Sequence, residues 1–166
     1  HSFIQTLNGD RWNDKGGTPQ IRELFRKHPE WFPMDAEGNR VMPTTSHSKL
    51  ETTNQELVRW FADRAIEYVH KNPRPVTYSL SPSDGGGWSR SPESVALYDP
   101  SPSNLFDPEA PAGHPGMSSL VLKWYHDVAS EVQKKAPDVR LAGYIYATYV
   151  YPPTKGDMKL PDNFTP

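Results

Sequence analysis

Residues whose types and spacing suit chemistry gather between Val76 and Ser94. The apolar run Val76–Leu80 is rich in β-branched and aromatic residues and follows two prolines, which predicts a buried strand. This run leads into Asp84, three consecutive glycines and Trp88. Glycines let a backbone approach a ligand closely, and an indole offers a flat apolar face. A carboxylate, a glycine turn and an aromatic ring at a strand end favour a sugar-binding site, although the same residues would also make a simple polar turn.

Asp84 is the first candidate for acid–base catalysis. Glycosidases use two carboxylates about 5–9 Å apart, one on each side of the bond that they cleave. Glu30 is the candidate partner, because its aromatic neighbour Trp31 would partly desolvate it, while Glu93 and Asp10 are alternatives. Each of the two main candidates also has a structural interpretation. Asp84 would cap the glycine amides of a turn, and Glu30 would only fix the end of a short helix.

Aromatic and histidine side chains supply the candidate substrate contacts. Trp31 and Trp88 stand in predicted loops and Tyr146 on a predicted strand, where their rings could stack on sugar C–H faces or simply pack against the fold. His1 and His28 lie in segments that approach the predicted strand ends. No H-x-x-x-H or H-E-x-x-H spacing occurs, so we expect no metal site and no cofactor.

The composition limits the classes of partner. A chain of 166 residues with a net charge of −2 fits one domain and gives no reason to expect nucleic acid as a partner. No apolar run approaches the roughly 18 residues that would cross a membrane, and we expect no membrane contact. The chain has no cysteine, so it has neither disulfides nor thiolate metal sites. Its compartment stays undecided, a secreted or periplasmic location included, because the sequence begins at His1 without a signal-like apolar stretch.

Helices and strands alternate in the pattern of the sequence. Apolar periodicity predicts a short helix that begins at Thr18-Pro19, a longer helix from Thr53 to Lys71 with a capping box, and a helix over residues 118–136. Strands are predicted at 2–7, 76–80 and 139–149, with another near Phe164. Each long helix runs into a strand, which indicates a parallel α/β fold. The long loops 8–52 and 82–117 would then share the face at the carboxyl ends of the strands, where such folds bind ligands.

Four short motifs carry a resemblance to a known family. They are His28-Pro29-Glu30-Trp31-Phe32, Gly38-x-Arg40, Thr53-Asn54 at a helix start, and Ser79-Leu80-Ser81-Pro82-x-Asp84-Gly85. In this order and spacing they resemble a bacterial family of unknown function that is grouped with TIM-barrel glycoside hydrolases and compared with α-glucuronidases and hexosaminidases. His1-Ser2-Phe3 resembles the strand end that precedes the first motif. The resemblance covers nearly the whole chain and implies the middle of such a barrel, about three to four of its eight βα units.

One departure from the family concerns the loop after Asp84. The family commonly carries C-x-C-x-x-C there, and this chain has Ser89, Ser91 and Ser94. Serine hydroxyls are poor substitutes for thiolates, so a zinc or a disulfide at this point is not expected here. We expect the loop to be kept without its crosslink.

The sequence and the resemblance together predict an α/β fold of parallel βα units. Residues 1–166 would form a single TIM-barrel-like, glycoside hydrolase-like domain or a fragment of a larger barrel, whose remainder would be a partner. The expected function is hydrolysis of a glycosidic bond in a carbohydrate ligand by carboxylate acid/base catalysis, with Asp84 and Glu30 as catalytic residues. Two alternatives stay open: a non-catalytic glycan-binding protein, and a structural fragment whose catalytic residues lie outside this chain.

Overall fold

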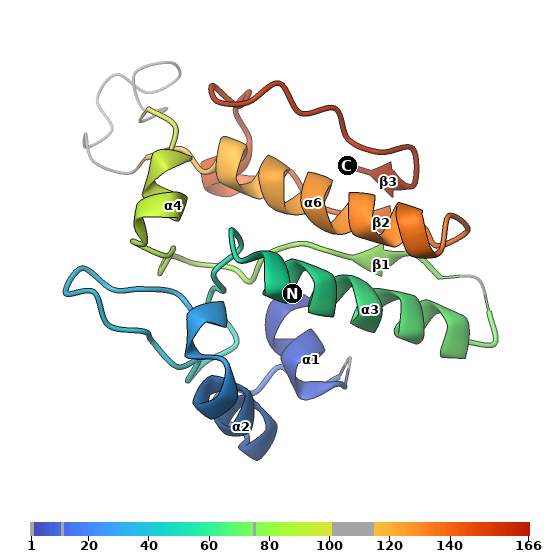
Figure 1. Cartoon of the computed structure of the whole chain (residues 1–166), viewed down its shortest axis with the longest axis horizontal. Coiled ribbons are helices and arrows are strands. Elements are labelled where there is room, and N and C mark those ends of the chain that lie inside the picture. Colours follow the sequence, from blue (N-terminus) through green and yellow to red (C-terminus); the bar gives the residue numbers. More distant parts are fainter. Residues whose placement is uncertain (1, 11, 75, 101–114) are drawn as a thin grey trace.

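The computed structural model of the chain describes residues 2–10, 12–74, 76–100 and 115–166 (Figure 1). His1, one of the predicted substrate contacts, lies outside the described residues. The elements in chain order are α1 (Ser2–Asn8), α2 (Pro19–Lys27), the 3-10 helix η1 (Pro29–Trp31), α3 (Gln55–Lys71), β1 (Tyr78–Ser79), α4 (Pro92–Ala96), α6 (Ser118–Lys135), β2 (Leu141–Ala142), the 3-10 helix η2 (Ala147–Tyr149) and β3 (Phe164–Thr165).

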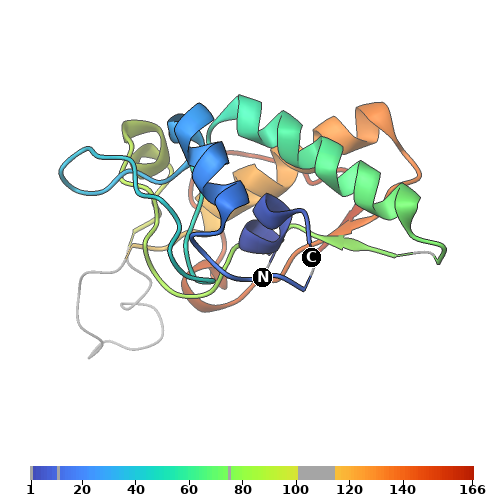
Figure 2. The ribbon, with the colours of Figure 1, turned by 90° about the horizontal axis from the view of Figure 1, so that it is seen from below.

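A small parallel sheet with strand order β1-β2-β3 forms one layer of the structure, and the long helices α3 and α6 form the other (Figures 1 and 2). In the sheet register, Tyr78, Leu141 and Phe164 stand side by side, as do Ser79, Ala142 and Thr165. The first set points toward the helices, because Tyr78 contacts Phe61 of α3 and Phe164 contacts Tyr125 of α6. The second set lies on the opposite face, because side chains alternate along a strand, and it consists of small residues.

Aromatic packing between α3 and α6 forms the centre of the core. Trp124 of α6 is fully buried and lies 4.9 Å from Phe61 of α3 between ring centroids. Its indole N–H donates to the carbonyl of Leu80 at 3.0 Å, which fixes α6 to the end of β1. Both long helices were predicted from their periodicity, and both are confirmed. The N-cap of α3 is Asn54 rather than Thr53, because the Asn54 side chain accepts from the amides of Glu56 and Leu57.

Residues 2–7 form a helix, so the predicted strand there is wrong. Phe3, Ile4 and Leu7 fall on one helical face, and all three are buried. Phe3 packs edge-on against Phe61 of α3 at 6.0 Å and against Trp124 of α6 at 5.4 Å, which fixes this helix against both long helices. The apolar run at the start of the chain therefore follows a helical period, which the pattern did not reveal because the helix has only about two turns.

The two predicted inner strands are also much shorter in the structure. In the run 76–80 only Leu80 is buried, and its amide closes the ladder to the carbonyl of Ala142 at 2.7 Å. The run 139–149 was predicted as one buried strand, but Tyr144, Ile145 and Tyr146 are exposed. The ladder ends because the amide of Tyr144 turns to the hydroxyl of Ser81 at 2.9 Å instead of a strand partner.

The result is an open α/β structure with a small parallel sheet, and the predicted alternation of helices and strands is confirmed at this level. The strand near Phe164 is present as β3. Within the described residues the sheet does not close into a barrel, and β1 and β3 form its two edges. In the described part of the chain, no helix combines the length and the apolar character needed to cross a membrane.

Candidate functional site

Asp84 and Tyr146 meet beyond the carboxyl ends of β1 and β2. The Tyr146 hydroxyl donates a hydrogen bond to Oδ1 of Asp84. The Tyr146 ring lies 5.2 Å from the ring of Tyr149, which in turn lies 6.1 Å from Trp88. Three predicted site residues, Asp84, Trp88 and Tyr146, are therefore brought together, with Tyr149 as the link between them. This is the arrangement that parallel strands produce, because their carboxyl ends lie at the same edge of a sheet.

Lys49 lies underneath this group and is a residue that the sequence analysis did not select. Its side chain is 1% exposed. The ammonium donates hydrogen bonds to the main-chain carbonyls of Ser83 and Asp84, the latter at 2.9 Å, and it stands 4.7 Å from the centre of the Trp88 ring. Burial lowers the pKa of Lys49 to about 8, while the Asp84 carboxylate acts in the opposite direction. Lys49 thus fixes the backbone that carries Asp84 and the ring of Trp88 from the same side.

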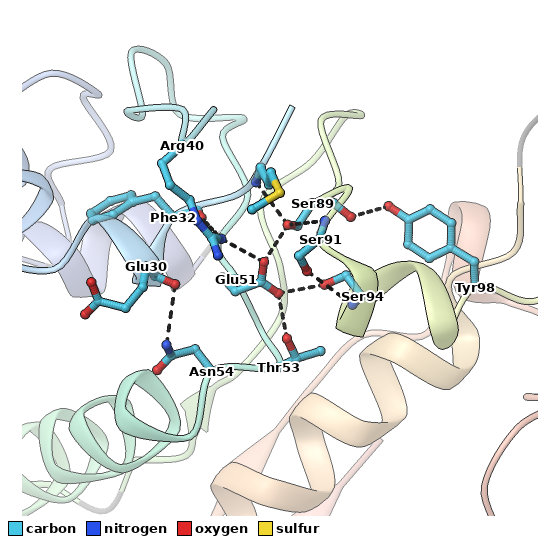
Figure 3. A network of polar contacts seen from close by, with 11 residues as sticks. Glu30, Phe32, Arg40, Glu51, Thr53, Asn54, Ser89, Ser91, Ser94 and Tyr98 are labelled. Atoms are coloured by element: carbon cyan, nitrogen blue, oxygen red, sulfur yellow. Dashed lines mark hydrogen bonds and ion pairs between the residues drawn. The ribbon is translucent and has the colours of Figure 1, made fainter. Parts of the chain in front are cut away.

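A buried carboxylate, Glu51, holds the rest of the loop after Asp84 (Figure 3). Its side chain accepts hydrogen bonds from the hydroxyls of Ser89 at 2.5 Å, Ser94 at 2.7 Å and Thr53 at 2.7 Å, and Arg40 pairs with it at 3.0 Å. Burial alone would raise the pKa of Glu51, but these hydroxyl donors outweigh it, and the pKa lies below its usual range. The carboxylate is therefore ionised in the fold at neutral pH.

Three serines of this loop, Ser89, Ser91 and Ser94, all belong to this network. Ser89 and Ser94 donate to Glu51, and the Ser91 hydroxyl accepts from the Ser94 amide at 3.2 Å as the N-cap of α4. All three are buried. Hydrogen bonds from Ser89 and Ser94 to one carboxylate therefore hold this loop.

Glu30, the second catalytic candidate, belongs to a different group of side chains. Nδ1 of His28 lies 3.3 Å from Oε1 of Glu30 and 3.8 Å from Oε1 of Glu56. The His28 ring stacks on Trp31 at 4.0 Å, and Trp31 is 2% exposed. Trp31 is thus a core residue that supports His28, rather than a loop residue with a free face.

One nitrogen and two carboxylate oxygens of His28, Glu30 and Glu56 lie within 4.8 Å of one another. Such a donor set could hold a divalent cation, since histidine and carboxylate are ordinary zinc ligands. The sequence did not indicate this set, because Glu56 comes from the first turn of α3 and is far from His28 in the chain.

The two missed residues of the site, Lys49 and Glu51, stand in the segment Ser48-Lys49-Leu50-Glu51-Thr52. Leu50 is buried between them, so one signal was present: charged residues on both sides of an apolar residue, just before a helix cap. No spacing rule connects that segment to residues 83–94. Only the folded chain shows that the two segments lie together.

The fold and the site define an open α/β domain that has a carboxylate and a group of aromatic rings at its strand ends. Residues 18–163 match the family described as domain of unknown function (DUF4838), and the chain belongs to this family. No curated protein and no solved structure is significantly similar to the chain.

Proposed function

We propose that this domain binds a carbohydrate beyond the carboxyl ends of β1 and β2 and hydrolyses a glycosidic bond there, with Asp84 as the acid/base residue. The observation that supports the proposal is the contact between the Tyr146 hydroxyl and the Asp84 carboxylate beside the rings of Trp88 and Tyr149. A carboxylate can accept from sugar hydroxyls or exchange a proton with a glycosidic oxygen. The aromatic rings next to it supply apolar faces for the C–H side of a sugar.

The side chains around Asp84 suit an orienting role. The Tyr146 hydroxyl donates to Oδ1 of Asp84 and so helps to orient the carboxylate. Lys49 is directed at backbone carbonyls and at the Trp88 ring, so its charge stabilises the loop from below. Ala147 has a strained backbone with φ of 52° and stands between Tyr146 and Tyr149, whose rings lie 5.2 Å apart.

The second carboxylate of a hydrolase would be Glu30 or would come from further strands of a TIM-barrel-like domain, of which this sheet would be a part. Support for a larger barrel comes from the parallel sheet, whose helices cover one face and leave Ser79, Ala142 and Thr165 on the other. The interior of such a barrel is formed by that helix-free face. Glu30 contacts His28 in this structure. Its role as the carboxylate opposite Asp84, on the other side of a bound sugar, belongs to the proposal.

A second candidate function is glycan binding without hydrolysis. The engagement of Glu30 by His28 favours it, because a lone carboxylate with aromatic rings is sufficient for binding but not for acid/base hydrolysis. In that case Asp84 and the aromatic rings beside it would contact the sugar as proposed above, without cleaving it.

Asp84→Asn separates the two functions. We expect wild-type protein to release reducing ends from at least one member of a panel of neutral and uronic-acid-containing oligosaccharides. Asp84→Asn should lower kcat by about 100-fold or more while the sugar still binds, because the amide cannot exchange the proton. Asp157→Asn, at an exposed position, is the matched control. If the wild type binds a sugar without cleaving it, the binding function is favoured. If the wild type neither binds nor cleaves any sugar of the panel, the carbohydrate proposal is refuted.

A further inference from the structure

A cleft of about 590 Å³ runs along β1 on the side away from β2, and Asp10, an alternative candidate for the second carboxylate, is among the residues that line it. Its walls are the end of α1 with the turn that follows it and the second half of α3. The wall at α1 is fixed to β1, because the hydroxyls of Thr6 and Tyr78 share a hydrogen bond of 2.5 Å. The volume is within the range of small-molecule binding sites, roughly 300–1,000 Å³.

Tyr144 connects this cleft to the site at Asp84. Its side chain lines the cleft and is 67% exposed. Its ring also contacts the Tyr146 ring, with 6.3 Å between the centroids, and Tyr146 binds Asp84. A ligand that lies in the cleft and extends past Tyr144 therefore reaches the Asp84 carboxylate.

The floor of the cleft offers main-chain hydrogen-bonding groups. The amides of Tyr78 and Leu80 point to β2, where they donate to the carbonyls of Arg140 and Ala142. Because the direction of main-chain groups alternates along a strand, those of Thr77 and Ser79 face the other way, toward the cleft that both residues line. Amide donors and carbonyl acceptors in a row suit a ligand with many hydroxyl groups.

The charges in the cleft favour a neutral ligand. Glu67 pairs with Arg64 at 2.7 Å and with Lys71 at 2.5 Å, and Asp10 adds a second carboxylate. Two acidic and two basic side chains balance, so neither an anion nor a cation is attracted by a net field. Trp12 also lines the cleft with 86% of its surface exposed, and its indole can cover an apolar sugar face.

We propose that this cleft binds a neutral oligosaccharide, which extends past Tyr144 to Asp84. The inference rests on the proposed function and adds its substrate class: an uncharged chain of several sugars, recognised along the β1 edge. The affinity of the cleft should rise with the length of the oligosaccharide, since Trp12 lines the cleft and Asp84 does not.

Calorimetric titration with xylo-, cello- and malto-oligosaccharides of increasing length tests this, with oligogalacturonides as the acidic comparison. Wild type should bind at least one neutral series, with tighter binding of longer members. Trp12→Ala and Glu67→Gln should each lower the affinity for the longest member by about three- to tenfold and leave that for the shortest unchanged. Val41→Ala, at an exposed position outside the cleft, is the matched control, and a thermal melt shows that each variant is folded.

The inference about the cleft and the proposed function fail in different ways. Suppose that Trp12→Ala and Glu67→Gln bind long neutral oligosaccharides as tightly as wild type, while Trp88→Ala binds them more weakly. This result would refute binding in the cleft and leave the proposed site at Asp84 intact. Tighter binding of the oligogalacturonides than of the neutral oligosaccharides would refute the proposal that the ligand is neutral. If no sugar of either kind binds to wild type, the cleft and the carbohydrate proposal are both refuted.

Discussion

Lys49→Met is the change that tests most sharply how the loop at Asp84 is held. Methionine keeps the unbranched stem and removes the ammonium that donates to Ser83 and Asp84. The lysine is 1% exposed, and its burial lowers the pKa from 10.5 to about 8. The cost of burying the charged form must therefore appear as a pH-dependent part of the free energy of unfolding.

The sign follows from where the two states lose the proton. Between about pH 8 and 10.5 the unfolded chain keeps a proton on Lys49 that the native protein has released, so the native state gains stability as the pH rises. The free energy of unfolding rises by at most about 1.4 kcal/mol per pH unit in this interval. Because the pKa of Lys49 falls from 10.5 to about 8, the total gain is about 3 kcal/mol. Lys49→Met lacks this contribution, so the wild type should gain relative to the variant across this interval.

Urea unfolding of both proteins at several pH values from about 7 to 11 measures the difference directly. Other groups that titrate in this range are present in both proteins and largely cancel in the comparison. Lys159→Met, at an exposed position, should show a constant difference from wild type. Parallel curves for wild type and Lys49→Met over the whole range would refute the burial of a charged Lys49.

Three further changes test the scaffold around the site. Glu51→Gln should lower the free energy of unfolding by about 2–4 kcal/mol at neutral pH, because Arg40 and the serine donors lose their carboxylate, while Glu37→Gln at an exposed position should have little effect. The difference in the free energy of unfolding between wild type and Glu51→Gln should become smaller in acid, since the contribution of Glu51 is lost as the pH falls through its lowered pKa. An unchanged difference in acid would contradict this account. Gly143→Ala should destabilise by about 1–3 kcal/mol in urea unfolding, because its Cβ would lie 2.4 Å from the Tyr125 ring, whereas Gly86→Ala, with open space around it, should be nearly neutral. Ala147→Gly should raise the melting temperature, with a gain of about 0.5 kcal/mol, because φ of 52° suits glycine; a loss of stability would show that this backbone is not strained.

The sequence predicted the long helices and the position of the site for different physical reasons. Helices α3 and α6 each have several turns of apolar periodicity, so the pattern is averaged over many residues. Asp84 and Tyr146 were placed together by topology, because the ends of neighbouring parallel strands meet whatever the length of the strands. That rule held although β1 and β2 contain only two residues each.

The strand lengths and the supporting residues depend on tertiary contacts that leave no local pattern. The run after β2 is apolar and aromatic, yet the Ser81 hydroxyl takes the Tyr144 amide and ends the ladder. Lys49 and Glu51 both have partners at positions 83–94, and a single sequence does not connect these segments. Trp31 was predicted as a substrate contact from its place in a loop, but His28 stacks on its ring and Trp60 packs against it at a tilt, so it is part of the core.

A crystal structure of Asp84→Asn with the neutral oligosaccharide that binds most tightly tests the proposed site most directly. The account predicts a sugar ring against Tyr146 or Trp88, with a hydroxyl or the glycosidic oxygen about 2.6–3.2 Å from the side chain at position 84. The chain of sugars should continue past Tyr144 toward Trp12. A sugar bound elsewhere, with no contact to residue 84 or to these rings, would contradict the account.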